Sequence, residues 1–225
     1  KDTAGNFNDA IAIYQAIDTV APTLAITSDR NALEIGETAT ITFTFSEAPG
    51  DTFAWNGSNG DIAVSGGSLG AISLDSNSNG LKYTATFTPT AGTGPGSASI
   101  TVASGKYLDA AGNTGTPSAA ATTVTVDTTP PSTPASAPSG YSDDAGSLTS
   151  SSASNTAAST DDTTPGIFVG IGLTDTPKLY VDGALVAATY NSSTGTLTPT
   201  TALLDGSHTF SYSLTDASGN ESAKS

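Results

Sequence analysis

The sequence predicts an all-β fold of tandem sandwich domains in an elongated array, and three observations support it. Apolar and polar residues alternate over short runs, as they do in strands that bury one face. Turn-forming glycines separate the runs, and glutamate, lysine and arginine, which favour helices, are scarce. The pentad Asp-x-x-Gly-Asn begins at Asp2, Asp109 and Asp216, at equal intervals of 107 residues. A fixed period of that length indicates one repeated domain.

The first complete domain is predicted to span residues 18–127. Four of its runs alternate apolar and polar residues with period two, at residues 38–45, 82–88, 97–103 and 122–126. Turn signals rich in glycine and asparagine lie between these runs. About seven short strands over roughly a hundred residues are typical of an immunoglobulin-like β-sandwich, which is the fold we expect here.

The second domain is predicted to span residues 128–225 and to lack its last strand, because the sequence stops just after the third pentad. Its opening, to about residue 162, is rich in serine, alanine and aspartate, and by itself it resembles a linker. Strands are expected after it, at residues 166–171, 178–181, 185–190 and 207–214. The last run alternates His208 with Phe210 and Tyr212, so His208 is expected to be a packed strand residue.

Residues 1–17 are predicted to be the end of a preceding repeat, with residues 6–17 as its terminal strand. A sandwich that lacks a strand has an unpaired edge, and such an edge invites strand addition. One interpretation is that this segment completes the second domain of another copy of the chain. The other interpretation is that the two ends reflect only how the fragment was cut.

The net charge of −15 comes mostly from aspartate. Such a chain is not expected to bind nucleic acid through its phosphates, and an anionic membrane would repel it. No apolar run is long enough for direct membrane insertion. Cysteine is absent, so no thiolate site is expected, and the single histidine is expected to pack in a strand and not to act as a catalytic base. The sequence therefore favours a protein that is not an enzyme.

The topology of an immunoglobulin-like sandwich predicts a metal site where the chain enters the domain. The loop after the second strand and the loop before the last strand both lie at this entry pole. They bring Glu47 and Asp109 of the pentad toward Asp18 in the entering linker. Like charges held together need a cation, and Asn113 adds an amide oxygen. Calcium accepts about six to eight oxygen ligands of these kinds, so calcium is the expected ion.

The same topology predicts a second calcium site at the joint between the two domains. The expected ligands are Asp127, Asp175, Asp216 and Asn220, with Asp143 and Asp144 as further candidates. Asp2 begins the pentad of the preceding repeat, so it would belong to a third joint, upstream of these two. The alternative interpretation of each pentad is a tight turn, which Asp caps and in which Gly and Asn adopt left-handed dihedrals.

Several runs resemble the bacterial Ig-like repeats of giant, type I-secreted surface adhesins and biofilm-associated proteins. In the first domain the resemblance is carried by residues 18–23, 36–41, 83–89 and 107–113. The second domain is similar to a sister type of repeat, over residues 161–165, 179–183 and 204–210. The resemblance implies an extracellular location on the bacterial cell surface, calcium at the joints, and neighbouring repeats of the same chain as partners.

The function expected from these features is that of a stalk or extender that supports adhesion or biofilm formation. Two other hypotheses remain open. One is a self-assembling fibre or surface-layer subunit, in which copies are joined by strand donation. The other is a module that binds a glycan or a protein through Trp55 and the polar loop that follows it.

Overall fold

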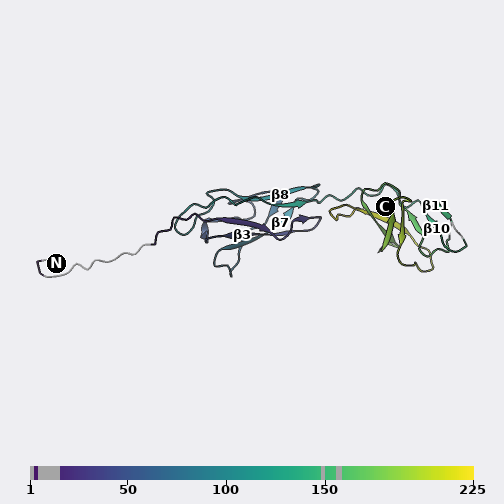
Figure 1. Cartoon of the computed structure of the whole chain (residues 1–225), viewed down its shortest axis with the longest axis horizontal. Coiled ribbons are helices and arrows are strands. Elements are labelled where there is room, and N and C mark those ends of the chain that lie inside the picture. The colour runs from purple at the N-terminus through teal and green to yellow at the C-terminus, as the bar shows by residue number, and fades with distance from the viewer. Residues whose placement is uncertain (1–2, 5–15, 148–149, 156–158) are drawn as a thin grey trace.

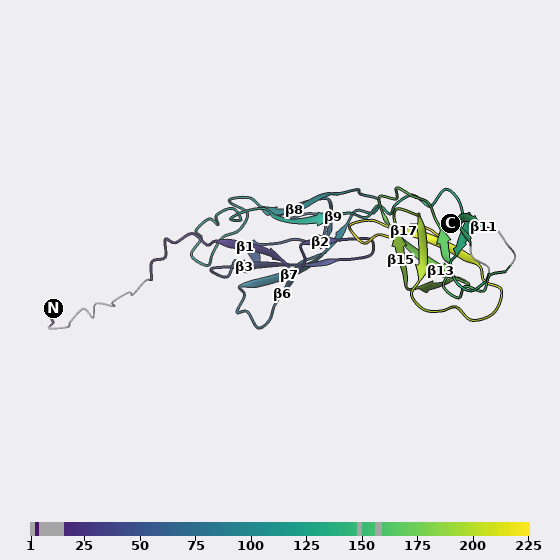
Figure 2. The same cartoon turned by 45° about the vertical axis from the view of Figure 1, so that its right-hand side comes forward.

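A computed structural model describes residues 3–4, 16–147, 150–155 and 159–225 of the chain. It shows two β-sandwiches arranged end to end along the long axis (Figure 1), and a view turned by 45° shows the same arrangement (Figure 2). In the described ranges the only helical element is the short 3-10 turn η1 (Gly50–Thr52), and no helix is long and apolar enough to cross a membrane. The predicted all-β fold and elongated arrangement are confirmed.

The first sandwich consists of two sheets. One has the strand order β1-β3-β7-β5, with β6 also paired to β7, and the other has the order β2-β9-β8-β4. The strands are β1 (Leu24–Ser28), β2 (Ala32–Leu33), β3 (Ala39–Phe45), β4 (Ile62–Ser65), β5 (Gly67–Leu69), β6 (Ser73–Leu74), β7 (Lys82–Pro89), β8 (Gly96–Val102) and β9 (Thr122–Val126). The four runs predicted from alternation are therefore confirmed, with small shifts at their ends.

These strands form because each one buries its apolar face in a shared core. In β3, Ile41 and Phe43 are fully buried, whereas Thr40 between two buried positions is exposed. Phe87 of β7 and Ile100 of β8 are also fully buried, so both sheets contribute to one core. Burying each of these side chains stabilises the sandwich by about 1.5–3 kcal/mol.

The second sandwich also has two sheets, with strand orders β11-β10-β12-β16-β15 and β14-β13-β17. Its strands are β10 (Gly140–Asp143), β11 (Ser150–Asn155), β12 (Gly166–Phe168), β13 (Thr176–Val181), β14 (Ala184–Val186), β15 (Ala188–Asn191), β16 (Thr196–Pro199) and β17 (Phe210–Thr215). Its core is separate from that of the first sandwich and includes Ile167, Leu179 and Leu197.

The interpretation of residues 128–162 as linker-like was wrong, because β10 and β11 lie within them. β10 pairs antiparallel with both β11 and β12, so backbone hydrogen bonds hold it in the sheet despite its low apolar content. Tyr141 alone in β10 packs against the core. Composition does not reveal a strand whose stability comes mainly from its neighbours.

All four strands predicted in the second domain have different bounds in the structure, and one of them, β13, differs only in beginning earlier, at Thr176. β12 ends at Phe168 because Gly170 follows at φ 110°, and its N–H donates to the Gly195 carbonyl outside the ladder. The run 185–190 is divided between β14 and β15. β17 begins at Phe210, so the prediction that His208 is a packed strand residue was also wrong.

The His208 ring instead connects two loops. Its Nδ1 lies 2.7 Å from Asp182 Oδ2 and its Nε2 lies 2.8 Å from the Leu204 carbonyl. The Leu204 carbonyl, and then the Asp182 carboxylate, raise the pKa of His208 above its ordinary 6.5. Asp182 itself adopts φ 52° in the turn between β13 and β14, which is a favoured conformation for Asp-Gly hairpins.

The predicted terminal strand at residues 6–17 lies almost entirely outside the described residues.

We predict that the second sandwich loses stability as the pH rises through the folded pKa of His208. A histidine whose pKa is raised on folding stabilises the fold fully below its unfolded pKa, and that contribution disappears above its folded pKa. The chain has one histidine and no cysteine, which simplifies the assignment. Thermal melts of wild type and His208→Gln between about pH 5.5 and pH 8.5 measure the effect. Identical pH profiles for the two proteins would contradict it.

Candidate metal centre

The middle pentad forms a tight turn that is closed by its own side chains. Asp109 Oδ1 accepts hydrogen bonds from the backbone N–H groups of Ala111, at 2.9 Å, and Asn113, at 2.8 Å. Gly112 has φ 90°, which side-chain-bearing residues rarely adopt. The turn interpretation of this pentad is correct for the aspartate cap and the left-handed glycine, whereas Asn113 does not adopt a left-handed dihedral. The turn is compatible with metal binding, because Asp109 Oδ2 accepts a hydrogen bond from Asn113 Nδ2 and has a second lone pair.

The last pentad repeats this turn. Asp216 Oδ1 accepts from the N–H groups of Ser218 and Asn220, both at 2.9 Å, and Gly219 has φ 104°. The two pentads thus share one conformation as well as one sequence pattern. The period found in the sequence corresponds to a repeated structural feature.

In each domain, the asparagine of the pentad holds the linker that enters that domain. Asn113 Nδ2 donates to Asp109 Oδ2 at 2.8 Å and to the Asp18 carbonyl at 3.2 Å. Asn220 Nδ2 makes the equivalent bonds, at 3.0 Å each, to Asp216 Oδ2 and the Asp127 carbonyl. The linker aspartate is therefore placed beside the pentad aspartate at both entry poles.

Three carboxylates meet at the entry pole of the first domain. Asp18, Glu47 and Asp109 each offer one oxygen, and these oxygens all lie within 4.8 Å of one another. Asp18 is exposed, Glu47 is intermediate and Asp109 is only 7% exposed. In the part of the chain that the structure describes, this is the one such group of three or more metal-ligating side chains. Three segments that the sequence predicted to meet do so here.

The charges in this group perturb one another. Burial, followed by repulsion from Asp18 and Asp109, raises the pKa of Glu47 above its ordinary 4.5. Burial also acts to raise the pKa of Asp109, but hydrogen bonds from Asn113, Ala111 and Gly112 outweigh it and lower that pKa below 3.8. Asp109 is therefore held as a carboxylate, whereas burial and repulsion disfavour the ionised form of Glu47. A divalent cation among these oxygens would relieve that repulsion.

Tyr107 fixes the linker on the buried side of this group. Its side chain is 1% exposed, and its hydroxyl lies 2.8 Å from the Thr116 carbonyl and 3.2 Å from the Pro22 carbonyl. A Cβ at Gly115 would come 2.3 Å from the Tyr107 ring, so a glycine is required beside it. The hydroxyl thus joins the start of the first domain to the segment that follows the pentad.

The first joint is the entry pole of the first domain, and the second joint lies between the two domains. They differ in the hydrogen bonds that the linker aspartate accepts. Ser218 stands where the middle pentad has Ala111, and its hydroxyl donates to Asp127 Oδ2 at 3.0 Å. Asp127 Oδ1 accepts from the Thr129 N–H at 3.2 Å, and Asp127 is only 6% exposed. Both oxygens of this linker aspartate therefore already have hydrogen-bond donors.

A direct contact between the two domains also lies at the second joint. The Ile35 N–H of the first domain donates to Asn220 Oδ1 at 2.9 Å. The Glu34 carboxylate lies against the turn, since a Cβ at Gly219 would come 2.1 Å from its Oε2. Sequence reasoning treated residues 34–37 only as a turn and missed this role. Their position between two strand signals gave no indication of which domain end they would reach.

The other predicted ligands are placed differently. Asp175 precedes Thr176, which pairs with Thr215 next to Asp216, so Asp175 lies at the same edge as the pentad. It takes no part in the hydrogen-bonded group around Asn220. Asp2 lies outside the described residues.

The suggestion that Asp143 and Asp144 add to the second joint is not supported. Asp143 accepts from Thr160 Oγ1 at 2.7 Å, and Thr160 lines a cavity with His208, near the start of β17. Asp216 directly follows the other end of that strand. The first strand of the sandwich carries Asp143 away from the joint, toward the opposite pole.

Glu221 fastens the chain just after the last pentad. Burial acts to raise its pKa, but hydrogen bonds from Lys178, Ser213 and Tyr180 dominate and lower the pKa of Glu221 to about 2. The Lys178 Nζ to Glu221 Oε2 distance is 2.8 Å. This anchor on β13 keeps the third pentad in register with the sheet.

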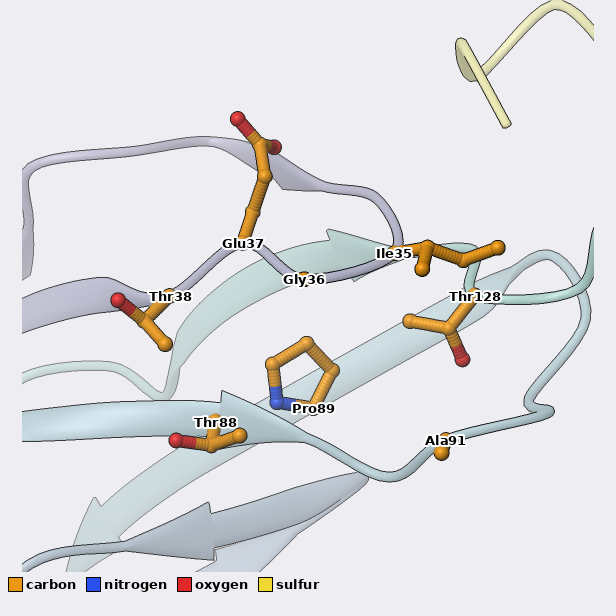
Figure 3. Close-up of a pocket in the computed structure, with 8 residues that line it drawn as sticks. All are labelled: Ile35, Gly36, Glu37, Thr38, Thr88, Pro89, Ala91 and Thr128. Atoms are coloured by element: carbon orange, nitrogen blue, oxygen red, sulfur yellow. The ribbon is translucent and has the colours of Figure 1, made fainter. Parts of the chain in front are cut away.

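A shallow hollow of about 280 Å³ lies at the end of the first sandwich, beside the second joint. Figure 3 shows Thr38 and Thr88 on one side of Pro89, with Ile35 and Thr128 on the other. Its one carboxylate, Glu37, is paired with Arg30. The hollow therefore offers an apolar surface next to the joint rather than a catalytic arrangement.

Residues 18–126 match the family model described as bacterial Ig-like domain, so the chain contains a bacterial Ig-like domain. The immunoglobulin-like class predicted from strand number is thereby confirmed. A comparison with curated proteins gave no match.

Three solved structures to which the chain is similar have low sequence identity to it. The N-terminal part of the bacterial S-layer protein SbsC is 10% identical with a TM-score of 0.28, over 91% of this chain and 43% of that one. The S-layer protein rSbsC(31-844) is 14% identical, and domains 1–6 of the surface layer protein SbsC are 16% identical. Both have a TM-score of 0.28, over 90% of this chain and 33% of theirs. The chain thus spans less than half of each.

We predict that Asn220→Ala loosens the joint between the two sandwiches. The substitution removes the bonds to Ile35, Asp127 and Asp216, and it destabilises the second sandwich by about 1–3 kcal/mol. Small-angle scattering should show a broader distribution of interdomain distances. Asn113→Ala is the matched control, because it changes the same turn at the first joint. Scattering by Asn220→Ala that is unchanged from wild type would refute the prediction.

We predict that Tyr107→Phe destabilises the first sandwich by about 1–2 kcal/mol, because it removes the buried hydroxyl that lies between the Thr116 and Pro22 carbonyls and leaves the Thr116 carbonyl without this donor. Denaturant unfolding measures the change. Tyr83→Phe is the control, since Tyr83 packs against the same core but its hydroxyl bonds neither carbonyl. Equal losses in the two variants would show that the Tyr107 hydroxyl has no special role.

Proposed function

We propose that this chain is a structural spacer of a bacterial cell-surface protein, with calcium holding the first joint rigid. The observation that carries the proposal is the convergence of Asp18, Glu47 and Asp109 oxygens within 4.8 Å. The three residues come from a linker, a loop after β3 and a pentad turn, so one ion would connect all three segments. Oxygen-only ligands at this charge density suit calcium.

The proposed role is mechanical and not catalytic. Two sandwiches lie end to end, and the Ile35–Asn220 hydrogen bond connects them directly. The bacterial Ig-like domain at residues 18–126 is consistent with an extracellular spacer that supports adhesion or biofilm formation. In such a spacer, stiffness depends on the joints, because each sandwich is already a packed unit.

The two joints are proposed to be held by different means. At the first joint Ala111 offers no side-chain donor and Glu47 adds a third carboxylate, so calcium supplies the missing positive charge. At the second joint Ser218 and Asn220 supply hydrogen bonds to the linker. A calcium ion there, near Asp127 and Asp216, remains an expectation from the sequence.

The glycan-binding alternative has less support. The Trp55 indole N–H donates to the Leu69 carbonyl at 3.1 Å, and the ring packs against the core of the first sandwich. A ring held in this way is a structural element of the loop. The strand-donation alternative depends on residues 1–17, most of which lie outside the described ranges.

We predict that calcium raises the melting temperature of the first sandwich in wild type. In the Glu47→Gln variant, calcium should leave the melting temperature of that sandwich unchanged. Calcium sites of extracellular modules have Kd values of roughly 10⁻⁴–10⁻³ M. Calcium at about a hundred times Kd stabilises the folded state by about 2.7 kcal/mol. Calorimetric scans in calcium and in chelator measure the difference. In chelator, Glu47→Gln should melt higher than wild type, because it removes a repelled charge.

The control for this experiment is Asp51→Asn, which removes an exposed carboxylate outside the group while leaving the three oxygens in place. It should keep the full response to calcium. Superimposed wild-type melting curves in calcium and chelator would exclude calcium from the first joint.

A further inference from the structure

A second acidic group lies at the pole of the second sandwich opposite the joint. It consists of Asp143, the last residue of β10, and Asp162, which precedes β12. The Thr160 hydroxyl connects them, since it donates to Asp143 Oδ2 at 2.7 Å and accepts from the Asp162 N–H at 3.0 Å. This group shares no residue with the joints described above.

Both carboxylates are buried, and each has one oxygen without a partner. Asp143 is 2% exposed and Asp162 is 6% exposed. Asp162 Oδ1 accepts from the Thr164 N–H at 2.7 Å, whereas Asp162 Oδ2 and Asp143 Oδ1 have no hydrogen-bond partner. They are two of the three buried side-chain atoms left unpaired within the described parts of the chain.

Such an arrangement is costly without a further ligand. A buried polar atom with no partner loses its hydration and gains nothing in return. The Thr160 hydroxyl contacts the carboxylate of Asp143 but only the backbone N–H of Asp162, so it neutralises neither charge. Two buried carboxylates near one segment also repel each other, and burial weakens the screening by water. Buried charges in proteins are therefore usually paired or coordinate a metal.

Among the described residues, no lysine, arginine or histidine forms an ion pair with Asp143 or Asp162. The ion pairs found in the described ranges are Arg30–Glu37, Lys106–Asp61, Lys178–Glu221 and His208–Asp182. His208 lines the same cavity as Asp162, but both of its ring nitrogens are engaged by Asp182 and Leu204. The atoms available as metal ligands are thus oxygens, which favour calcium over zinc or another transition metal.

We propose that Asp143 and Asp162 bind a divalent cation of the calcium type inside the second sandwich. Asp143 Oδ1 and Asp162 Oδ2 would be its protein ligands. Asp162 lines a cavity of about 570 Å³, which has room for the waters that complete the coordination. Asp161 and Asp205 line the same cavity and add negative charge around it.

The ion would fasten the start of the second domain. It would tie the end of β10 to the segment at residues 159–165, which leads into β12. Because β10 has little apolar content of its own, this end of the sheet gains most from an added ligand. The proposal is independent of calcium at the first joint, so either can fail alone.

The test measures backbone hydrogen exchange in the full chain carrying Glu47→Gln, which removes the proposed first-joint site. At a calcium concentration of about a hundred times Kd, exchange at residues 140–143 and 166–168 should slow by up to about a hundredfold relative to chelator. Asp162→Asn in the same background should abolish that protection. Asp144→Asn, which changes an exposed neighbour of Asp143, should retain it.

Asp143→Asn is a second variant, for the case in which Asp162→Asn does not fold. In chelator, either variant should protect these strands at least as well as the parent, because each removes a buried charge. Magnesium in place of calcium should protect less, since it requires a stricter octahedron.

Three results would overturn the proposal. The first is the absence of calcium-dependent protection at these strands in the Glu47→Gln chain. The second is protection that survives both Asp143→Asn and Asp162→Asn. The third is protection that disappears as the pH rises, irrespective of calcium, which would show that the two carboxylates share a proton instead.

Discussion

One hydrogen bond at each entry pole determines how the rest of the joint is built. It runs from the amide of the pentad asparagine to the backbone carbonyl of the linker aspartate, at Asn113–Asp18 and at Asn220–Asp127. The donor is positioned because the pentad aspartate binds the same amide and caps the turn. Without this bond the backbone carbonyl of the linker aspartate would not be held by the amide of the pentad asparagine. With it, the linker carboxylate must lie beside the pentad carboxylate, and the two negative charges repel each other.

The two joints share the same backbone turn, but different side chains surround the repelling carboxylates. At the first, Glu47 brings a third negative charge, and repulsion contributes to its raised pKa. At the second, a serine replaces an alanine and donates to the linker carboxylate, while Asn220 also accepts from the preceding domain. The presence of Glu47 at the first joint, and of Ser218 and the Ile35 contact at the second, thus distinguishes a group of three carboxylates from a hydrogen-bonded contact. Stiffness along the chain can therefore vary from joint to joint with little change in the fold.

Prediction from sequence succeeded where local periodicity and topology were sufficient. Four of the nine strands of the first domain, β3, β7, β8 and β9, follow from alternation, because one face of each is buried in a large core. The meeting of Asp18, Glu47 and Asp109 follows from strand order. Prediction from sequence failed for β10 and β11, which have few apolar residues. β10 is held by its pairing with β11 and β12. The prediction also placed Asp143 at the wrong pole, because the strand that carries it was not recognised.

The sequence by itself determined the all-β class, the repeat length and the turn at the two pentads that the structure describes in full, since these depend on residues close together in the chain. Only the tertiary structure decided which charges are satisfied and which are not. Asp127 and Asp143 look alike in sequence, as aspartates in polar surroundings. The first has donors for both oxygens, and the second has a buried oxygen with none. That difference arises from partners far away in the chain, which composition and spacing do not reveal.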